Sequence, residues 1–415
     1  MKRLSFVLTI LIIMLASASL LTSCTVQPAQ PSQPIKIGLI AELTGDRSVV
    51  GTSCKNAAEL AVKEINDAGG LEISMKKYPV ELVVADNASK EDQTISAAQN
   101  LITLDNVVAV VGPNASRLAI PASWIAENTK TVLISPWSTS PETTLDTATN
   151  APKKYVFRAA FTDGLQGRAI AAFAWNNLGA KRAAVLYDVD SAYNRVLAEE
   201  FKSYFTTGTG DAVIFTGLDG APVGEIQSIG GGQVVAFESY HTGDQNFTAQ
   251  LTRIKEANPD LIFLPNYSNE VPLQIQQAKA LGVTAPFLGG DGWGSVDLLR
   301  QCGADCEGHY FSAHYAADNP SPAAAKFIEA YQSAYGAIPD DVAALTYDSF
   351  QLLFSALKSA AKVDREALRG ALARVSIDGV TGPIRFQTGT GDPAKNVVIL
   401  QIKGDKFVWF ANTRP

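Results

Sequence analysis

The fold is decided by a stretch near the start of the 415-residue chain, Ile35-Lys-Ile-Gly-Leu-Ile-Ala41. Its apolar, β-branched residues predict a strand that is buried on both faces. A helical pattern follows around residues 54–68 and ends at the pair Gly69-Gly70, and residues 80–85 are the next apolar run. A strand, a helix and a second strand in this order predict a parallel βαβ unit.

The same alternation runs through most of the chain, in two halves. In the first half, helices are expected at 92–104 and 116–128, and strands at 107–111 and 131–135. After Arg158 the alternation begins again, with helices expected at 164–178, 192–205, 247–257 and 268–281, and strands at 182–188, 234–237, 261–265 and 286–288. The predicted class is therefore α/β, with two doubly wound lobes, each a parallel sheet of similar size covered by helices on both faces.

Two later parts break this rhythm. Residues 206–232 are rich in Gly and weakly patterned, which predicts an extended surface loop. The tail returns to short apolar runs, expected as strands at 383–387, 397–403 and 407–410.

The composition agrees with a large globular protein and excludes other classes. Hydrophobic residues make up 47% of the chain, enough for a sizeable core, so disorder is not expected. The 34 basic and 41 acidic residues leave a net charge of −7, the wrong sign for neutralising nucleic-acid phosphates. Dinucleotide, phosphate-loop, nucleophile-elbow and metalloprotease motifs are missing from the sequence, so we expect neither an enzyme nor a cofactor.

The first residues are predicted to be a targeting segment. Two basic residues precede a near-continuous apolar run, from Leu4 to Leu21, that contains no acid, as in a secretory signal. An uncleaved transmembrane anchor is the alternative, because the run is just long enough to span a bilayer. The ending Leu21-Thr-Ser-Cys24 resembles the bacterial lipoprotein signal, which implies removal of residues 1–23 and lipidation of Cys24. Residues 24–34 then form a lipid anchor and polar tether.

Two further cysteines, Cys302 and Cys306, enclose a short Gly-Ala-Asp loop. In an oxidising compartment they could pair, and we expect a local disulfide. Their spacing is also that of half a metal site, but no second pair of Cys or His in the sequence completes it. His309 and His314 lie five residues apart, and a surface or core role is favoured over a metal site. We therefore expect no metal.

Polar residues follow several expected strands, where open parallel sheets bind their ligands. In the first half these are Ser116, which opens a helix, and the run Trp137-Ser138-Thr139. Hydroxyls and the N–H groups of a helix N-terminus suit a carboxylate, although ordinary helix caps would explain them too.

The second half carries acidic and aromatic residues at the corresponding positions. Tyr193 follows one strand, Tyr267 another, and Asp291 lies among glycines after a third. Such groups could hold a cation between a charge and ring faces, whereas plain packing and a turn-forming Asp are the alternatives. Donors on one lobe and acceptors on the other would together match a zwitterion.

Six motifs resemble those of a known family and occur in its order and spacing. They are Ile37-Gly-Leu-Ile-Ala-Glu-Leu-Thr44-Gly45, Ala61-Val-Lys-Glu-Ile65-Asn66-Asp-Ala-Gly69-Gly70, Val111-Gly112-Pro113, Ile134-Ser135-Pro136, Leu288-Gly289-Gly290-Asp291-Gly292 and Ala343-Ala-Leu-Thr-Tyr347-Asp348. Over nearly all of residues 35–411 the chain resembles the branched-chain amino-acid (Leu/Ile/Val-binding) type of periplasmic solute-binding protein. The resemblance implies the periplasmic-binding protein type I fold, with a ligand cleft between two lobes.

The resemblance also implies how the chain divides. Three crossings between the lobes are expected, near Arg158–Thr162, Phe311–His314 and Ile384–Gln387. The first lobe would comprise residues 35–160 and 312–383, and the second lobe residues 161–311 and 384–415.

Site residues follow from the same resemblance. The ligand carboxylate is expected at Ser116, Trp137, Ser138 and Thr139, the ammonium at Asp163 and Asp291, and the aromatic contacts at Tyr193 and Tyr267. Some positions depart from the family's pattern: Val50 stands where leucine-like binders often have an aromatic, Trp137 replaces a small residue, and Arg47 could face the cleft. These departures leave the amino-acid anchor intact but change the side-chain pocket.

The resemblance implies a monomeric solute-binding lipoprotein of an ABC importer, held outside the cytoplasm on the cell membrane or outer membrane. It would capture an α-amino acid, branched-chain or similar, by lobe closure and deliver it to a membrane permease, with no nucleic-acid partner. Hinge closure around a ligand is typical of such proteins. Two alternatives stay open: a carrier of another small polar solute (an amide, urea or an aromatic acid), and a ligand-sensing domain that signals by closing.

Overall fold

The computed structural model describes residues 32–208, 213–216, 223 and 230–413. The expected signal peptide, Cys24 and most of the tether lie outside these residues, as does most of the predicted surface loop at 206–232. Within the described ranges, no helix is both long and apolar enough to cross a membrane.

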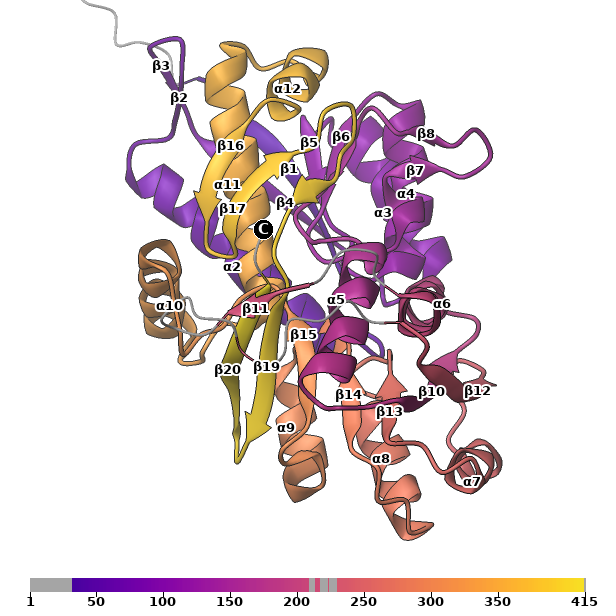
Figure 1. Cartoon of the computed structure of the whole chain (residues 1–415). Coiled ribbons are helices and arrows are strands. Elements are labelled where there is room, and N and C mark those ends of the chain that lie inside the picture. Colours follow the sequence, from indigo (N-terminus) through magenta and orange to yellow (C-terminus); the bar gives the residue numbers. More distant parts are fainter. Residues whose placement is uncertain (1–31, 209–212, 217–222, 224–229, 414–415) are drawn as a thin grey trace, which may run out of the picture. The chain divides into compact units, whose positions relative to one another are not determined.

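The first sheet is built around β1 (Ile35–Ala41), the buried strand that the apolar run predicts. The strand order is β4-β1-β5-β6-β9, and every pair in the sheet is parallel. The other strands are β4 (Val80–Asp86), β5 (Ala109–Val111), β6 (Val132–Ser135) and β9 (Val156–Arg158). Figure 1 shows these strands as a group separate from those of the second sheet.

Helices cover both faces of this sheet because alternate residues of a strand point to opposite sides. Ile37 and Leu39 face α2 (Ser48–Asp67) and α11 (Asp341–Ala360). Ile40 faces the opposite side, where α3 (Glu91–Thr103) and α4 (Ser116–Asn128) pack. This is the doubly wound arrangement expected for the first lobe.

The second sheet has eight described strands, in the order β11-β20-β19-β15-β14-β13-β10-β12. Its parallel part consists of β10 (Arg182–Asp188), β12 (Gln233–Tyr240), β13 (Leu261–Leu264), β14 (Phe287–Gly289) and β15 (Tyr310–Ala313). An antiparallel hairpin, β19 (Val398–Lys403) and β20 (Lys406–Thr413), extends it, followed by β11 (Phe215–Thr216). The two sheets are less equal in size than expected because the tail strands join the second one.

Helices also cover both faces of the second sheet. α5 (Asp163–Asn176) and α6 (Ala192–Thr207) pack on one face. α7 (Thr248–Glu256), α8 (Val271–Ala280) and α9 (Val296–Cys302) pack on the other. Cys302 and Cys306 form a disulfide that ties α9 to the turn η4 (Gly303–Cys306).

The segment between β15 and β19 belongs with the first sheet. It contains α10 (Pro322–Tyr335), α11, α12 (Arg365–Leu372) and a small sheet of β16 (Ser376–Gly379), β17 (Gly382–Phe386) and β18 (Pro393–Ala394). The remaining short elements are β2 (Leu71–Ile73), β3 (Lys76–Tyr78), η2 (Pro141–Thr143), β7 (Leu145–Asp146), β8 (Ala151–Pro152) and η3 (Asp291–Trp293). α11 packs along α2 and so fixes this segment to the first lobe.

The chain passes between the two lobes three times. The first passage lies between β9 and α5, and the second follows β15 at His314. The third was expected at Ile384–Gln387, and the structure corrects this: residues 384–386 lie in β17, which pairs with β16 and β18. The chain returns to the second sheet only between Ala394 and Val398, so the expected boundary at 383/384 moves to that segment. The apolar run of β17 looks like a strand of a main sheet, which explains the misplacement.

Candidate functional site

Ser116, Ser138 and Thr139 lie together beyond the carboxyl ends of β5 and β6. Ser116 is the first residue of α4, and its Oγ accepts hydrogen bonds from Ser138 Oγ (3.0 Å) and from the N–H of Ser140 (3.4 Å). Thr139 is buried, and its hydroxyl has no hydrogen-bond partner among the described residues. The turn after β6 therefore folds back on the N-terminus of α4 and places hydroxyls there.

Arg158, at the end of β9, fixes this turn. Its guanidinium is fully buried and donates to the carbonyls of Ser138 (2.7 Å) and Ser140 (2.8 Å). Its Nε donates to Asp392 Oδ1 at 2.6 Å. Because Arg158 occupies the carbonyl oxygens of the turn, hydroxyl and N–H donors remain for a ligand. No local pattern signals this role, since Asp392 is 234 residues away in the chain.

Asp163 and Asp291 supply acidic groups from the second lobe. Asp163 begins α5, and its N–H donates to the carbonyl of Thr139 (2.9 Å). Both of its carboxylate oxygens are buried without a hydrogen-bond partner among the described residues. Asp291 accepts a hydrogen bond from Gln166 Nε2 at 2.6 Å. Gln166 was not expected from the sequence, although it lies three residues after Asp163 and hence on the same face of α5.

The electrostatics of this pair favour an added cation. Burial raises the pKa of Asp163 well above its usual range; the Thr139 hydroxyl opposes the rise, and the nearby Asp291 adds to it. Burial also raises the pKa of Asp291 to about 6, while His314 opposes the rise. Two carboxyl groups that disfavour each other's charge are stabilised as carboxylates once a positive group is placed beside them. The pair is therefore chemically suited to an ammonium group.

Glycines hold Asp291 in place. A Cβ at Gly290 would come within 2.5 Å of the Tyr193 hydroxyl oxygen, and one at Gly292 within 2.8 Å of the Asn266 carbonyl oxygen. The N–H of Gly292 also donates to the Tyr193 hydroxyl, at 3.0 Å. The loop after β14 thus packs so closely against its neighbours that only glycine fits on either side of Asp291.

Three aromatic rings and one guanidinium join the two lobes. The ring of Tyr267 lies 4.9 Å from that of Tyr193 and 5.8 Å from that of Trp137, centre to centre. Arg47 Cζ lies 4.2 Å from the centre of the Tyr267 ring. Trp137 and Arg47 belong to the first lobe, whereas Tyr193 and Tyr267 belong to the second. The structure therefore gathers the aromatic residues singled out in the sequence at one place, with Arg47 added.

His314 lies behind Asp291 and links two of the passages between the lobes. Its ring stacks on Phe161 at 3.7 Å, its Nε2 accepts from the N–H of Phe161 (3.3 Å), and its Nδ1 pairs with Asp341 at 2.6 Å. Asp291, His314 and Asp341 are close enough together to be considered as a metal site. Both ring nitrogens of His314 already have partners, however, so the cluster is explained as part of the hinge. His314 is a buried residue, within the structural role expected for it.

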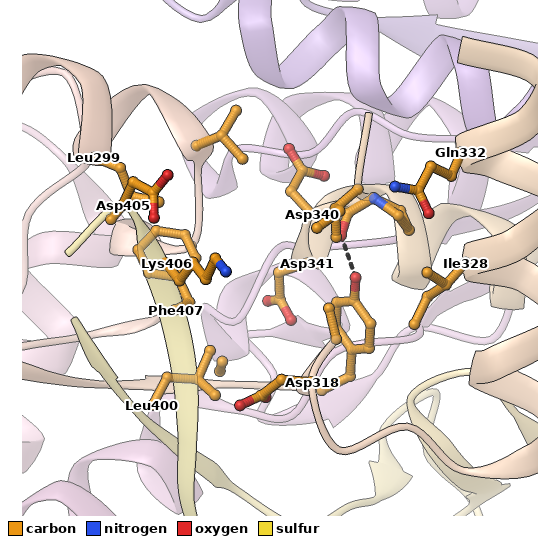
Figure 2. A pocket seen from close by; sticks show the side chains of 17 residues that line it. Leu299, Asp318, Ile328, Gln332, Asp340, Asp341, Leu400, Asp405, Lys406 and Phe407 are labelled. Atoms are coloured by element: carbon orange, nitrogen blue, oxygen red, sulfur yellow. Dashed lines mark hydrogen bonds between the residues drawn. The ribbon is translucent and has the colours of Figure 1, made fainter. Parts of the chain in front are cut away.

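Two cavities lie near these residues. The smaller, about 20 Å³, is lined by Arg47, Trp137 and Tyr267 among others and belongs to the cleft. The larger, about 340 Å³, is lined by none of the predicted ligand residues (Figure 2). Three of its four acidic residues have partners within the chain: Asp341 pairs with His314, Asp318 accepts from the N–H of Trp409 at 3.0 Å, and Asp340 accepts from the N–H of Ala343 at 2.9 Å. The unpartnered polar atoms described above thus lie at the cleft and not at the larger cavity.

Known proteins resemble this chain over most of its length. Residues 34–406 match the family described as periplasmic binding protein. The Leu/Ile/Val-binding protein homolog 3 of Brucella melitensis is 30% identical over 377 residues, which cover 90% of this chain and 91% of that protein.

Solved structures show the same fold. A leucine binding protein, LivK, from Thermotoga maritima superimposes with a TM-score of 0.79 at 32% identity, covering 92% of this chain and 99% of that one. A solute binding protein of an ABC transporter from Rhodopseudomonas palustris, in complex with 3,4-dihydroxybenzoic acid, has a TM-score of 0.75 at 26% identity, covering 92% of this chain and 97% of that one.

Proposed function

The chain belongs to the periplasmic binding protein family, and from that premise we propose that it captures an α-amino acid, branched-chain or similar, and delivers it to the membrane permease of an ABC importer. It is an extracytoplasmic solute-binding protein and not an enzyme. The proposal concerns the ligand, its delivery and the residues that hold it.

The observation that carries the proposal is that hydroxyl groups of the first lobe face acidic groups of the second. On the first lobe, the hydroxyl of Thr139 is buried without a partner among the described residues, beside the N-terminus of α4. On the second lobe, both carboxylate oxygens of Asp163 lack a partner at full hydrogen-bonding distance among the described residues, although the Thr139 hydroxyl is near enough to lower its pKa, and Asp291 lies nearby. Donors opposite acids are the complement of a zwitterion, because the carboxylate accepts from one side and the ammonium donates to the other. We assign Ser116, Ser138 and Thr139 to the carboxylate and Asp163 and Asp291 to the ammonium.

Lobe closure would couple binding to transport. Trp137 and Tyr267 approach each other from different lobes, and a ligand held between them would contact both. A ligand shifts an opening equilibrium by as much as its affinity differs between the two states, so contacts with both lobes favour the closed one. The proposed lipid on Cys24 would keep the protein, as a monomer, near its membrane partner.

The test is a thermal-shift screen of the twenty amino acids, followed by calorimetry on the one that binds most tightly. That amino acid is compared with its amide and with its decarboxylated amine. Loss of the carboxylate should weaken binding, because the donors at Ser116 and Thr139 would then face a group with less negative charge. Equal affinity for the amino acid and its amide would contradict the assigned carboxylate site.

An aromatic acid is the second candidate ligand. The three rings of Trp137, Tyr193 and Tyr267 would stack on such a compound, and the relative from Rhodopseudomonas palustris holds a dihydroxybenzoic acid. Including 3,4-dihydroxybenzoate in the screen separates the two candidates. Stabilisation by this acid alone would replace the amino acid as the proposed ligand.

A further inference from the structure

Arg47 is a buried cation at the cleft, and the binding of an α-amino acid does not itself require one there. It directly precedes α2, and its side chain is only 6% exposed. Its backbone N–H donates to Ser89 Oγ (3.4 Å), which fixes it to the first lobe. Its guanidinium reaches across to the second lobe and lies over the ring of Tyr267, 4.2 Å from the centre.

The hydrogen-bonding capacity of this cation is incompletely used. Nη1 donates to Asp46 Oδ2 at 3.4 Å, but that carboxylate is shared with Arg117 Nη2, also at 3.4 Å. Nε of Arg47 is buried without a partner among the described residues, and so is Nε1 of Trp137, which is 4% exposed. Leaving a buried donor unsatisfied is unfavourable by roughly 1–3 kcal/mol. Two such donors at one place indicate that a ligand brings acceptor atoms to them.

These donors are within reach of the amino-acid anchor. Tyr267 lies between the two: its ring is 4.2 Å from Arg47 Cζ on one side and 4.9 Å from the ring of Tyr193 on the other. The Tyr193 hydroxyl in turn accepts from the N–H of Gly292, the residue next to Asp291. The ring of Trp137 contacts Tyr267 on the same side. A ligand whose ammonium lies at Asp163 and Asp291 can therefore extend its side chain along Tyr267 toward Arg47.

The surroundings of Arg47 are polar. The small cavity beside it is also lined by Ser268, Asn269 and Ser295. Glu270 lies nearby; burial raises its pKa to about 7, and Arg47 and the Tyr240 hydroxyl oppose the rise. A partly protonated carboxyl beside a guanidinium suits a group that can both accept and donate, such as a carboxamide.

We propose that Arg47 selects α-amino acids whose side chain ends in a carboxamide or carboxylate over those with a branched aliphatic side chain. This inference rests on the proposed function, because it takes the α-amino-acid anchor as given, and it replaces the branched-chain ligand named there with one whose side chain is polar. A site built to hydrogen-bond a polar group rejects the apolar analogue strongly, since its buried donors are then left unpaired. This preference for a polar side chain is the opposite of what the name of the leucine binding protein from Thermotoga maritima indicates for that relative.

The test uses ligands of matched shape. Asparagine, aspartate and leucine share one branched skeleton, and glutamine, glutamate and methionine form a longer set. We expect calorimetry at pH 7 to show that the best polar member of at least one set binds at least roughly tenfold more tightly than its apolar member. The affinities for asparagine and aspartate, and for glutamine and glutamate, are then compared to decide whether the site prefers a carboxamide or a carboxylate.

Arg47→Met should invert this preference. The variant removes the guanidinium but keeps an unbranched apolar chain, so polar ligands should lose roughly tenfold in affinity and the apolar ones should gain or stay equal. Arg117→Met is the matched control, because it removes the other cation on Asp46 and should leave the order of ligands unchanged. Arg47→Lys, which keeps the charge without Nε, should give an intermediate result, and thermal unfolding checks that each variant is folded.

Two outcomes would overturn the inference alone. If leucine or methionine binds the unchanged protein more tightly than its polar counterparts, Arg47 does not select for oxygen-bearing side chains while the proposed function stands. If Arg47→Met and Arg117→Met alter the order of ligands equally, the selection does not reside in Arg47. Absence of binding by all twenty amino acids would instead remove the proposed function and this inference with it.

Discussion

Asp163 and Asp348 are both buried carboxylates, one at the cleft and the other on α11 beneath the turn between β16 and β17. Asp348 accepts hydrogen bonds from the N–H groups of Val380 (2.6 Å) and Thr381 (2.9 Å). Burial raises its pKa, and Lys395 opposes the rise. Both oxygens of Asp163 lack hydrogen-bond partners among the described residues, and its neighbour Asp291 is another acid.

The difference separates groups that hold the fold from groups that are available to a ligand. A buried carboxylate with internal partners joins distant segments, here a helix and a turn. One without them is unfavourable until something else supplies the missing contacts. Variants on the two sides of this comparison should therefore affect different quantities, stability at Asp348 and affinity at Asp163 and Asp291.

The largest effect is expected on affinity, from removing an acid of the cleft. Asp291→Ala or Asp163→Asn should weaken binding of the amino acid by roughly 2–5 kcal/mol, because the ammonium loses a desolvated partner. This corresponds to a loss of about thirtyfold to several thousandfold in calorimetry. Stability without ligand should fall much less than affinity: burial already disfavours the charge of both groups, and the main loss is the acceptor of Gln166 Nε2 in Asp291→Ala. An unchanged affinity would exclude the substituted residue from the site.

The next effect is expected on stability, from Asp348→Ala. The substitution leaves the N–H groups of Val380 and Thr381 without acceptors and Lys395 without its counter-charge, so the free energy of unfolding should fall by roughly 3 kcal/mol. Denaturant titration measures this, and Asp348→Asn, which keeps one acceptor oxygen, should lose less. Affinity should stay the same. A loss of affinity with stability unchanged would contradict the assignment of Asp348 to the fold.

The pH dependence should differ in sign between stability and affinity. The pKa of Asp291 is raised to about 6, so between about pH 4 and 6 the folded protein binds this proton more strongly than the unfolded chain. Stability of the ligand-free protein should therefore decrease as the pH rises through that interval, by at most about 3 kcal/mol from this group. Affinity for an ammonium ligand should increase over the same interval, because the carboxylate form is needed.

Urea titrations and calorimetry at pH 4.5, 5.5 and 7 test both trends. Asp291→Asn should reduce the pH dependence of affinity. The same variant should remove only part of the pH dependence of stability. The rest should come from Asp340, which lies outside the ammonium site and whose pKa burial also raises to about 6. Parallel trends in stability and affinity would contradict the assignment of Asp291 to the ligand.

The smallest effect is expected from the disulfide. Replacing Cys302 and Cys306 together by Ala opens a short loop at the end of α9, and should lower the free energy of unfolding by roughly 2 kcal/mol. A reductant should lower the stability of the unchanged protein by a similar amount and leave that of the variant unaltered. Affinity for the amino acid should not change. A loss of affinity would mean that the end of α9 contributes to the ligand site.

Much of the fold could be predicted because its parallel strands are buried on both faces and are therefore continuous apolar runs. The strands β1 and β10 and the helix α4 lie at the expected residues. α2 begins at Ser48, earlier than expected, because its first turn contains β-branched residues and a glycine that do not signal a helix. The antiparallel pairing of β19 and β20 with β15 and with each other could not be deduced, since strand order depends on long-range contacts.

The candidate site was predictable where the fold places residues at strand ends, as with Ser116, Tyr267 and Asp291. The residues that were missed act through partners far along the chain. Arg158 fixes the serine turn together with Asp392, and Gln166 reaches Asp291, 125 residues later. No local pattern carries such contacts, so only the assembled lobes reveal them.

The position of Trp137 gives the protein an optical signal of its own. The indole lies in the cleft against Tyr267, with its Nε1 unpartnered among the described residues, so a ligand would change the polarity around it. Trp293, by contrast, is fully buried and donates to the carbonyl of Leu264 at 3.1 Å. The chain has five tryptophans, and replacing the other four (Trp124, Trp175, Trp293 and Trp409) by Phe would leave a single fluorophore. Its emission would then report occupancy of the cleft without any attached dye.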